Sequence, residues 1–214
     1  MILTGPKIEA EVKRGNIIIE PYESSQINPN SYDFRIGDKL LIYSDKILDT
    51  KKQNPTRIIN IPKSGYVLRS NKIYLGHTIE KIGSNYYVPV VRGKSSTGRV
   101  GLFVHITADL IDIGYIGQFT LMLHAVQPVR IYPNMRIGQV TFWKVMGKII
   151  LYNGKYQGGI GPQASAIYKD FITAFKKTPD FQSGDELNAD MSSSFGRGNR
   201  GLKSAEDVIK VNFL

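Results

Sequence analysis

Short β-rich runs separated by asparagine, proline and glycine recur from residue 17 to residue 143. Branched and aromatic side chains dominate these runs, as is typical of strands with one half-buried face. The runs lie at residues 17–19, 32–36, 40–43, 66–68, 73–75, 86–91, 119–123, 129–131 and 137–143. Many short strands at close spacing, with turn residues between them, predict a mainly β fold built as a barrel or a double sheet.

A short amphipathic helix is predicted ahead of the first run. Pro6 stands near its start, Ile8 and Val12 lie four residues apart, and Gly15 follows its last turn. Proline is favoured in the first turn of a helix, and glycine is favoured just past the end. We therefore expect a helix over residues 5–15.

A second helix is predicted over residues 165–177. Ser165 is placed to cap its N-terminus, and apolar residues recur there at steps of four, namely Ile167, Phe171 and Phe175. Beyond Pro179 the composition changes to Ser, Gly, Asn, Asp and Arg. The sequence therefore predicts one domain over residues 1–178 and a flexible tail over residues 179–214.

Composition excludes several classes of protein. The 214 residues are 42% hydrophobic, and no apolar stretch approaches the roughly 18 residues that a membrane span requires. The first residues lack the long apolar run of a signal peptide, so we expect an intracellular, cytoplasmic protein with no membrane partner. The chain has no cysteine, and none of its three histidines stands in a His-x-Glu pattern, which excludes a zinc-dependent nucleobase deaminase.

The formal net charge of +10 indicates a polyanionic partner, either nucleic acid or a phosphorylated small molecule. A solubilising charge spread over the surface is the alternative. Basic residues occur as isolated pairs and not as the long runs of a nucleic-acid-binding arm, which makes nucleic acid the weaker of the two partners.

A cationic, hydroxyl-rich segment follows the sixth run. Lys94, Ser95, Ser96, Thr97 and Arg99 are bracketed by glycines at both ends. Backbone N–H groups, hydroxyls and a guanidinium together suit phosphate oxygens, so we interpret this segment as a phosphate-binding loop. An ordinary polar loop between strands is the alternative.

A carboxylate and an aromatic ring follow a little further on. Asp112 and Tyr115 precede Gly117. A carboxylate beside an aromatic ring can orient a water molecule and a sugar hydroxyl while the ring packs against the sugar. A simple turn is the alternative, because aspartate and glycine are both turn formers.

Taken in order, these segments resemble the dCTP deaminase and trimeric dUTPase superfamily. The resemblance covers most of the chain and leaves out only the last 35 or so residues. It rests on the first helix and on the segments at residues 1–3, 19–21, 28–37, 94–101, 105–117, 132–140 and 154–165. The last segment resembles the deaminase branch more than the shorter dUTPases.

The resemblance implies a distorted, dUTPase-like β-barrel that forms a homotrimer with active sites at the subunit interfaces. Each site would bind a deoxypyrimidine nucleoside triphosphate together with Mg²⁺, which is held through the substrate phosphates. Lys94 stands where the family usually has arginine, and so lacks the two-pronged guanidinium. The implied phosphate-binding residues are Lys94, Ser95, Ser96 and Arg99.

The remaining implied site residues concern the sugar, the base and closure over the nucleotide. Asp112 would contact the 3′-hydroxyl and a water molecule, and Tyr115 would pack on the deoxyribose and disfavour a ribose. Further substrate-binding positions are Ile106 and Thr107 through their backbone, Gln139, and the closing residues Lys155, Tyr156 and Gln163.

Met122 is the departure from the family pattern. The deaminase branch has a glutamate ten residues past the aspartate, and that glutamate activates the water that attacks ring carbon 4. A thioether cannot transfer protons, and losing a general base costs on the order of 10²–10⁴ in rate. Glu80, Glu20 or a carboxylate of the tail could substitute; otherwise Met122 is a harmless core residue in a misaligned strand.

Three functions therefore remain open. Mg²⁺-dependent hydrolysis of dUTP or dCTP to the monophosphate and pyrophosphate needs only the phosphate-binding groups and Asp112. Deamination of dCTP by a rearranged base is the second. A non-catalytic homologue that binds a nucleotide or a partner is the third. A weaker similarity links Phe195, Arg197 and Arg200 to the closing arm of dUTPases.

Overall fold

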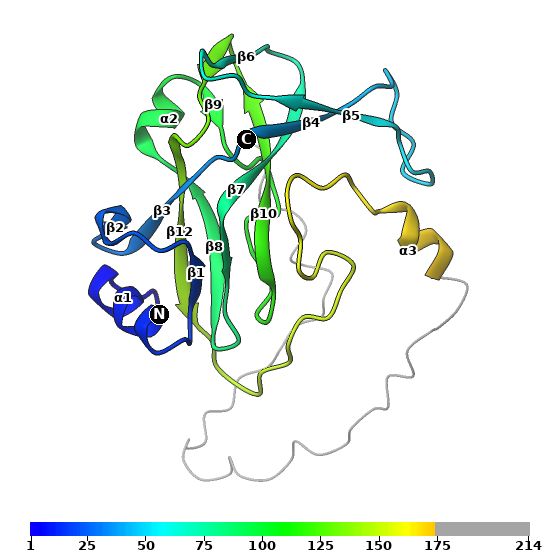
Figure 1. The fold of residues 1–214 in the computed structure, drawn as a ribbon. Helices are drawn as coiled ribbons and strands as arrows, with labels where there is room; N and C mark the ends of the chain where they lie inside the picture. The colour runs from blue at the N-terminus through cyan, green and yellow to red at the C-terminus, as the bar shows by residue number, and fades with distance from the viewer. Residues whose placement is uncertain (174–214) are drawn as a thin grey trace, which may run out of the picture. The chain divides into compact units, whose positions relative to one another are not determined.

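The computed structural model of the chain describes residues 1–173, whose strands form three antiparallel sheets (Figure 1). The largest sheet has the strand order β5-β4-β7-β10-β9, with β1 also paired to β7. Its strands are β1 (Ile18–Glu20), β4 (Lys39–Tyr43), β5 (Thr56–Asn60), β7 (Ile73–Gly83), β9 (Leu102–Phe103) and β10 (Ile116–Ala125).

The second sheet has the order β2-β3-β12-β8, and β6 pairs with β11 in the third. The strands are β2 (Ile27–Asn28), β3 (Ser31–Arg35), β6 (Tyr66–Leu68), β8 (Tyr87–Gly93), β11 (Val129–Ile131) and β12 (Arg136–Lys144). The helices are α1 (Gly5–Lys13), the 3₁₀ turn η1 (Ser24–Gln26), α2 (Ser95–Arg99) and α3 (Tyr168–Thr173). The prediction of a mainly β fold of the dUTPase type is confirmed, although the described strands form three sheets and not one continuous barrel.

The core lies between the sheets and takes one face of each long strand. Along β10, residues alternate between buried and half-buried positions from one end to the other. Leu121 and Leu123 are fully buried, as are Phe34 of β3 and Phe142 of β12. Because side chains of a strand point alternately to opposite faces, the other residues of β10 face away from this core.

The predicted N-terminal helix is confirmed. α1 contains Pro6 in its first turn, buries Ile8 completely, and is followed by Gly15 with a φ of 75°. That left-handed conformation is the one glycine adopts without a steric cost, so the residue ends the helix as expected.

The predicted C-terminal helix begins later than expected. α3 starts at Tyr168, and the Ser165 backbone N–H is bonded to the hydroxyl of Tyr43 at 2.9 Å. Ser165 lies three residues before this start, so it is not the residue that directly precedes the helix; its hydroxyl accepts the Ile167 N–H at 3.3 Å in the turn ahead of it. The predicted end of the helix at residue 177, and the predicted tail with Phe195, Arg197 and Arg200, lie outside the described residues.

The segment between β12 and α3 returns along β10, and we call residues 152–166 the strap (Figure 1). Gln118 of β10 receives two of its contacts: its N–H donates to the Gly159 carbonyl at 2.8 Å, and its side-chain oxygen accepts from the Gly161 N–H at 2.6 Å. The strap thus covers the face of β10 that the core leaves open. Within residues 1–173, no helix is both long enough and apolar enough to cross a membrane.

Candidate active site

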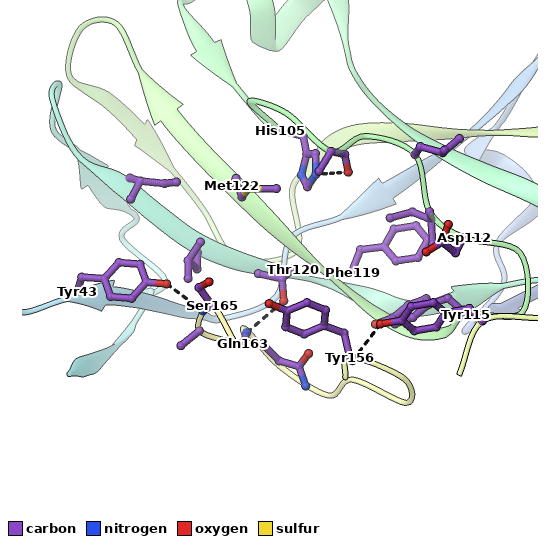
Figure 2. A pocket seen from close by; sticks show the side chains of 17 residues that line it. Tyr43, His105, Asp112, Tyr115, Phe119, Thr120, Met122, Tyr156, Gln163 and Ser165 are labelled. Atoms are coloured by element: carbon purple, nitrogen blue, oxygen red, sulfur yellow. Dashed lines mark hydrogen bonds between the residues drawn. The ribbon is translucent and has the colours of Figure 1, made fainter. Parts of the chain in front are cut away.

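A pocket of about 480 Å³ lies between the open face of β10 and the strap (Figure 2). Strands β4, β7 and β10 form one wall, the segment from His105 to Tyr115 forms another, and the strap closes the third side. The lining residues are Tyr43, Ile73, Leu75, His105, Ala108, Leu110, Ile111, Asp112, Tyr115, Phe119, Thr120, Met122, Tyr152, Tyr156, Gln163, Ala164 and Ser165.

Met122 stands in the wall of this large pocket. It is half-buried and pairs with Leu75 of β7, whereas its neighbours Leu121 and Leu123 point into the core. Thr120, two residues earlier, faces the same pocket, as the alternation along a strand requires. The structure therefore places the thioether at the pocket surface and not in the core.

Asp112 and Tyr115 also line the large pocket, and they belong to a turn. The Tyr115 N–H donates to the Asp112 carbonyl at 3.1 Å, while the Asp112 side chain is exposed at the pocket. Tyr115 is 8% exposed and donates its hydroxyl to the Gln118 carbonyl at 2.9 Å. Burial raises the pKa of Tyr115 to about 12, so this phenol stays protonated at neutral pH. The turn thus supplies one exposed carboxylate and one buried ring.

Ile106 and Thr107, expected to contact the base through their backbone, do not line the large pocket of the single chain. Both residues are exposed, and the large pocket is lined instead by His105 and Ala108 on either side of them. The His105 Nε2 lies 3.0 Å from the Ala108 carbonyl, and burial lowers the pKa of this histidine. A neutral imidazole therefore faces the pocket, and sequence reasoning did not assign it a role.

The carboxylates proposed as substitutes for the missing glutamate lie elsewhere. Glu80 is fully buried and paired with the Arg35 guanidinium at 2.7 Å, and Glu20 is paired with Lys81 at 3.6 Å. Neither lines the large pocket. Among the described residues that do, Asp112 is the single carboxylate.

A second pocket, of about 370 Å³, holds the predicted phosphate-binding residues, and we call it the phosphate pocket. Residues 95–99 form the short helix α2 and not the expected loop. Thr97 is buried and caps this turn, because its hydroxyl contacts the Lys94 N–H and carbonyl at 3.2 and 2.9 Å. The lining residues are Asn28, Asp33, Lys94, Ser95, Ser96, Arg99 and Gln139.

Charges in the phosphate pocket are already partly paired. The Lys94 ammonium bonds to Asp33, which is 4% exposed and also accepts from the Asn28 side chain at 2.8 Å. Gln139 also lines this pocket, and its side-chain amide donates a hydrogen bond to the Gly93 carbonyl at 2.9 Å. The Arg99 side chain is exposed at the pocket and is the cation there that makes no ion pair within residues 1–173.

The three residues expected to close over the nucleotide do not all lie in one pocket. Tyr156 and Gln163 line the large pocket. Lys155 lies outside both pockets and pairs with Asp170 of α3 at 2.6 Å. Among the residues that the structure describes, no three His, Asp or Glu side chains are grouped to hold a metal ion.

Known proteins share much of this sequence and its fold. The family profile described as dCTP deaminase-like matches residues 2–145. A curated protein of Clostridium beijerinckii named "dCTP deaminase, dUMP-forming" is 47% identical over 172 residues, covering 80% of this chain and 99% of that protein. A protein of the same name from Hathewaya histolytica is 45% identical over the same shares.

A solved structure shares the fold. The 2′-deoxycytidine 5′-triphosphate deaminase from Agrobacterium tumefaciens superposes with a TM-score of 0.53 at 21% identity. The match covers 66% of this chain, which spans about half the length of that protein (47%).

Proposed function

The chain belongs to the dCTP deaminase-like family, and on that basis we propose that it hydrolyses deoxypyrimidine nucleoside triphosphates, dUTP foremost, to the monophosphate and pyrophosphate. The curated relatives are named for forming dUMP from dCTP. That overall change breaks two bonds, one between ring carbon 4 and its amino nitrogen, and one between the α- and β-phosphates. This chain would retain the second reaction and lose the first.

The observation that carries the proposal is that Met122 and Asp112 line the same pocket. Replacing the amino group at ring carbon 4 by oxygen requires a group that takes a proton from water. A thioether has no such capacity, and removing a general base costs on the order of 10²–10⁴ in rate. Hydrolysis at the α-phosphate does not require that group, and the residues that suit it are present.

Each retained residue would have a distinct part in hydrolysis. Arg99 and the hydroxyls of Ser95 and Ser96 would bind the phosphate oxygens, and Lys94 would add a further positive charge. Asp112 would orient the attacking water and accept its proton as the water oxygen bonds to the α-phosphorus and pyrophosphate departs. Mg²⁺, bound through the substrate phosphates, would neutralise their negative charge.

The proposal includes assembly as a homotrimer. The residues proposed for the sugar, Asp112 and Tyr115, line one pocket of the chain, and those proposed for the phosphates line another. A nucleotide bound between neighbouring subunits could contact the large pocket of one subunit and the phosphate pocket of the next. Sedimentation equilibrium of the full chain tests this, and a monomer that turns over dUTP at full rate would contradict it.

Product identification tests the reaction directly. The full-length protein is incubated with Mg²⁺ and either dUTP or dCTP, and nucleotides are separated by anion-exchange chromatography. We expect dUMP and pyrophosphate from dUTP, and no uracil nucleotide from dCTP. Inertness toward both substrates would refute the proposal and favour a non-catalytic homologue, for which calorimetry would show binding without turnover.

Substitution of Met122 tests the physical reason. Met122→Glu restores a proton acceptor, so uracil nucleotides should appear from dCTP. Met122→Gln is the matched control, because it has a similar shape and polarity but cannot take a proton at neutral pH. Deamination by the unmodified protein, at a rate that Met122→Glu does not raise, would favour the alternative that this chain is a dCTP deaminase with a rearranged base, as the names of its relatives suggest.

A further inference from the structure

The large pocket presents hydroxyl hydrogens that have no acceptor. Hydroxyls on its wall accept backbone N–H groups of the strap, among them Tyr43 from Ser165 at 2.9 Å, Thr120 from Gln163 at 3.1 Å, and Tyr156 from Ala166 at 2.9 Å. A hydroxyl that accepts such a bond keeps its own hydrogen for donation. Within residues 1–173, none of these three hydrogens has an acceptor. The pocket therefore favours a ligand that brings acceptors.

The two ends of the large pocket differ in this respect. In Figure 2, Asp112 lies at one end and Tyr43 at the other, with Thr120 and Met122 between them. The Asp112 end has a carboxylate, which is a strong acceptor. At the Tyr43 end the neighbouring strand residues are Ile73, Leu75 and Met122, so the phenol is the polar group that the strands supply there.

The geometry of a pyrimidine nucleotide determines which of its atoms would meet Tyr43. The substituent on ring carbon 4 lies across the ring from the nitrogen that carries the sugar. With the sugar beside Asp112 and Tyr115, as in the proposed function, position 4 points toward the Tyr43 end. Uracil has a carbonyl acceptor at this position, whereas cytosine has an amino donor.

We propose that Tyr43 is a specificity-determining residue that selects a 4-oxo pyrimidine deoxynucleotide over a 4-amino one by donating its phenolic hydrogen to the 4-oxygen. This inference rests on the placement of the sugar in the proposed function. It names the substrate class as uracil-type. A 4-amino group at this end would face three apolar side chains and the hydroxyls of Tyr43 and Ser165, whose oxygens each already accept a backbone N–H. Its own hydrogens would therefore be poorly paired compared with water.

Calorimetry with non-hydrolysable analogues tests the proposal apart from turnover. The full chain is titrated with α,β-imido-dUTP and with α,β-imido-dCTP in the presence of Mg²⁺. An unpaired buried donor weakens binding by about tenfold to a hundredfold, so we expect the uracil analogue to bind tighter by about that ratio. Tyr43→Phe should bring the ratio close to one.

The ratio separates recognition of the base from attachment of the strap. Tyr43→Phe also removes the acceptor for the Ser165 N–H, but a loosened strap weakens both analogues alike and leaves their ratio unchanged. Tyr74→Phe is the matched control. Tyr74 also accepts a backbone N–H, from Arg69 at 3.1 Å, yet it does not line the pocket, so its loss should not alter the ratio.

A third ligand identifies the atom that is recognised. The corresponding analogue with a pyrimidin-2-one base has no substituent at position 4. Tyr43→Phe should therefore change its affinity only by the amount that loss of the Ser165 hydrogen bond to the strap causes. Equal affinity for the uracil and cytosine analogues, or tighter binding of cytosine, would overturn the inference even if dUTP is hydrolysed. Selective binding without hydrolysis would refute only the proposed reaction.

Discussion

The large pocket and the phosphate pocket differ in the chemical groups that line them. The phosphate pocket has cations and hydroxyls, although Lys94 is already paired with a buried carboxylate. The large pocket has one carboxylate, several hydroxyl donors and an apolar wall that includes Met122, at the position where the family resemblance predicts a glutamate. In the proposed function, the phosphate-binding groups and the position of the missing glutamate lie on different elements, so one reaction could be lost while the fold and the phosphate-binding groups remain.

The largest effect is expected from the carboxylate of the large pocket. Asp112→Asn keeps the shape of the side chain but removes the group that would accept a proton from water, so turnover of dUTP should fall by about 10²–10⁴. Steady-state kinetics measure the loss, and calorimetry with α,β-imido-dUTP should show affinity changed by no more than a few-fold. Unchanged turnover would show that Asp112 has no catalytic part.

The next effect is expected in the phosphate pocket. Arg99→Ala removes charged hydrogen bonds to the substrate, so affinity for α,β-imido-dUTP should fall by about tenfold to a hundredfold. Arg92→Ala is the control, because Arg92 is paired with Asp109 and lines neither pocket. Equal losses from both substitutions would indicate a general effect of surface charge.

A smaller effect is expected from restoring the family's usual residue at position 94. Arginine has five donors, so Lys94→Arg could stay bonded to Asp33 and still reach a phosphate oxygen. We expect affinity for α,β-imido-dUTP to rise by about two- to fivefold, the modest gain of one partly exposed charged contact. A lower affinity would mean that the Lys94–Asp33 pair is itself the arrangement that binds phosphate.

The smallest effect is expected on stability, from protonation of the His105 imidazole in the wall of the large pocket. Burial lowers the pKa of His105, so the folded protein binds fewer protons than the unfolded chain as pH falls through about 6.5. The contribution of His105 to the free energy of unfolding is therefore present above that pH and is lost as the pH falls below it. Thermal unfolding at pH 7.5 and 5.5 should show a smaller pH-dependent decrease for His105→Gln than for the unmodified protein; an equal decrease would contradict the assignment.

Most strands could be predicted from the sequence, and the exceptions share physical causes. β5 was missed because it is an edge strand with exposed residues on both faces, including Ile58 at 64% exposure, so it has no apolar-polar alternation. β7 is much longer than the predicted run at residues 73–75. Its continuation contains the buried Glu80, whose carboxylate is paired with the guanidinium and backbone N–H of Arg35 in β3. Such a pairing across sheets leaves no local pattern.

The candidate site shows the same division. Asp112, Tyr115, Tyr156 and Gln163 were predicted to act together, and they do line one pocket. Helix α2 was predicted as a loop because serine, threonine and glycine favour helices weakly, and the Thr97 cap forms only in the folded turn. The roles of Tyr43 and His105 in the pocket wall had no sequence signal.

The sequence by itself determined that this chain forms a mainly β fold of the dCTP deaminase-like family and that residue 122 is a thioether, because strand pattern and side-chain chemistry are local properties. Only the tertiary structure decided that Met122 faces a pocket and not the core, that Asp33 already pairs with Lys94, and that strap N–H groups leave the Tyr43 hydrogen free. These features depend on contacts between residues far apart in the chain, and a linear pattern contains no information on how such residues meet.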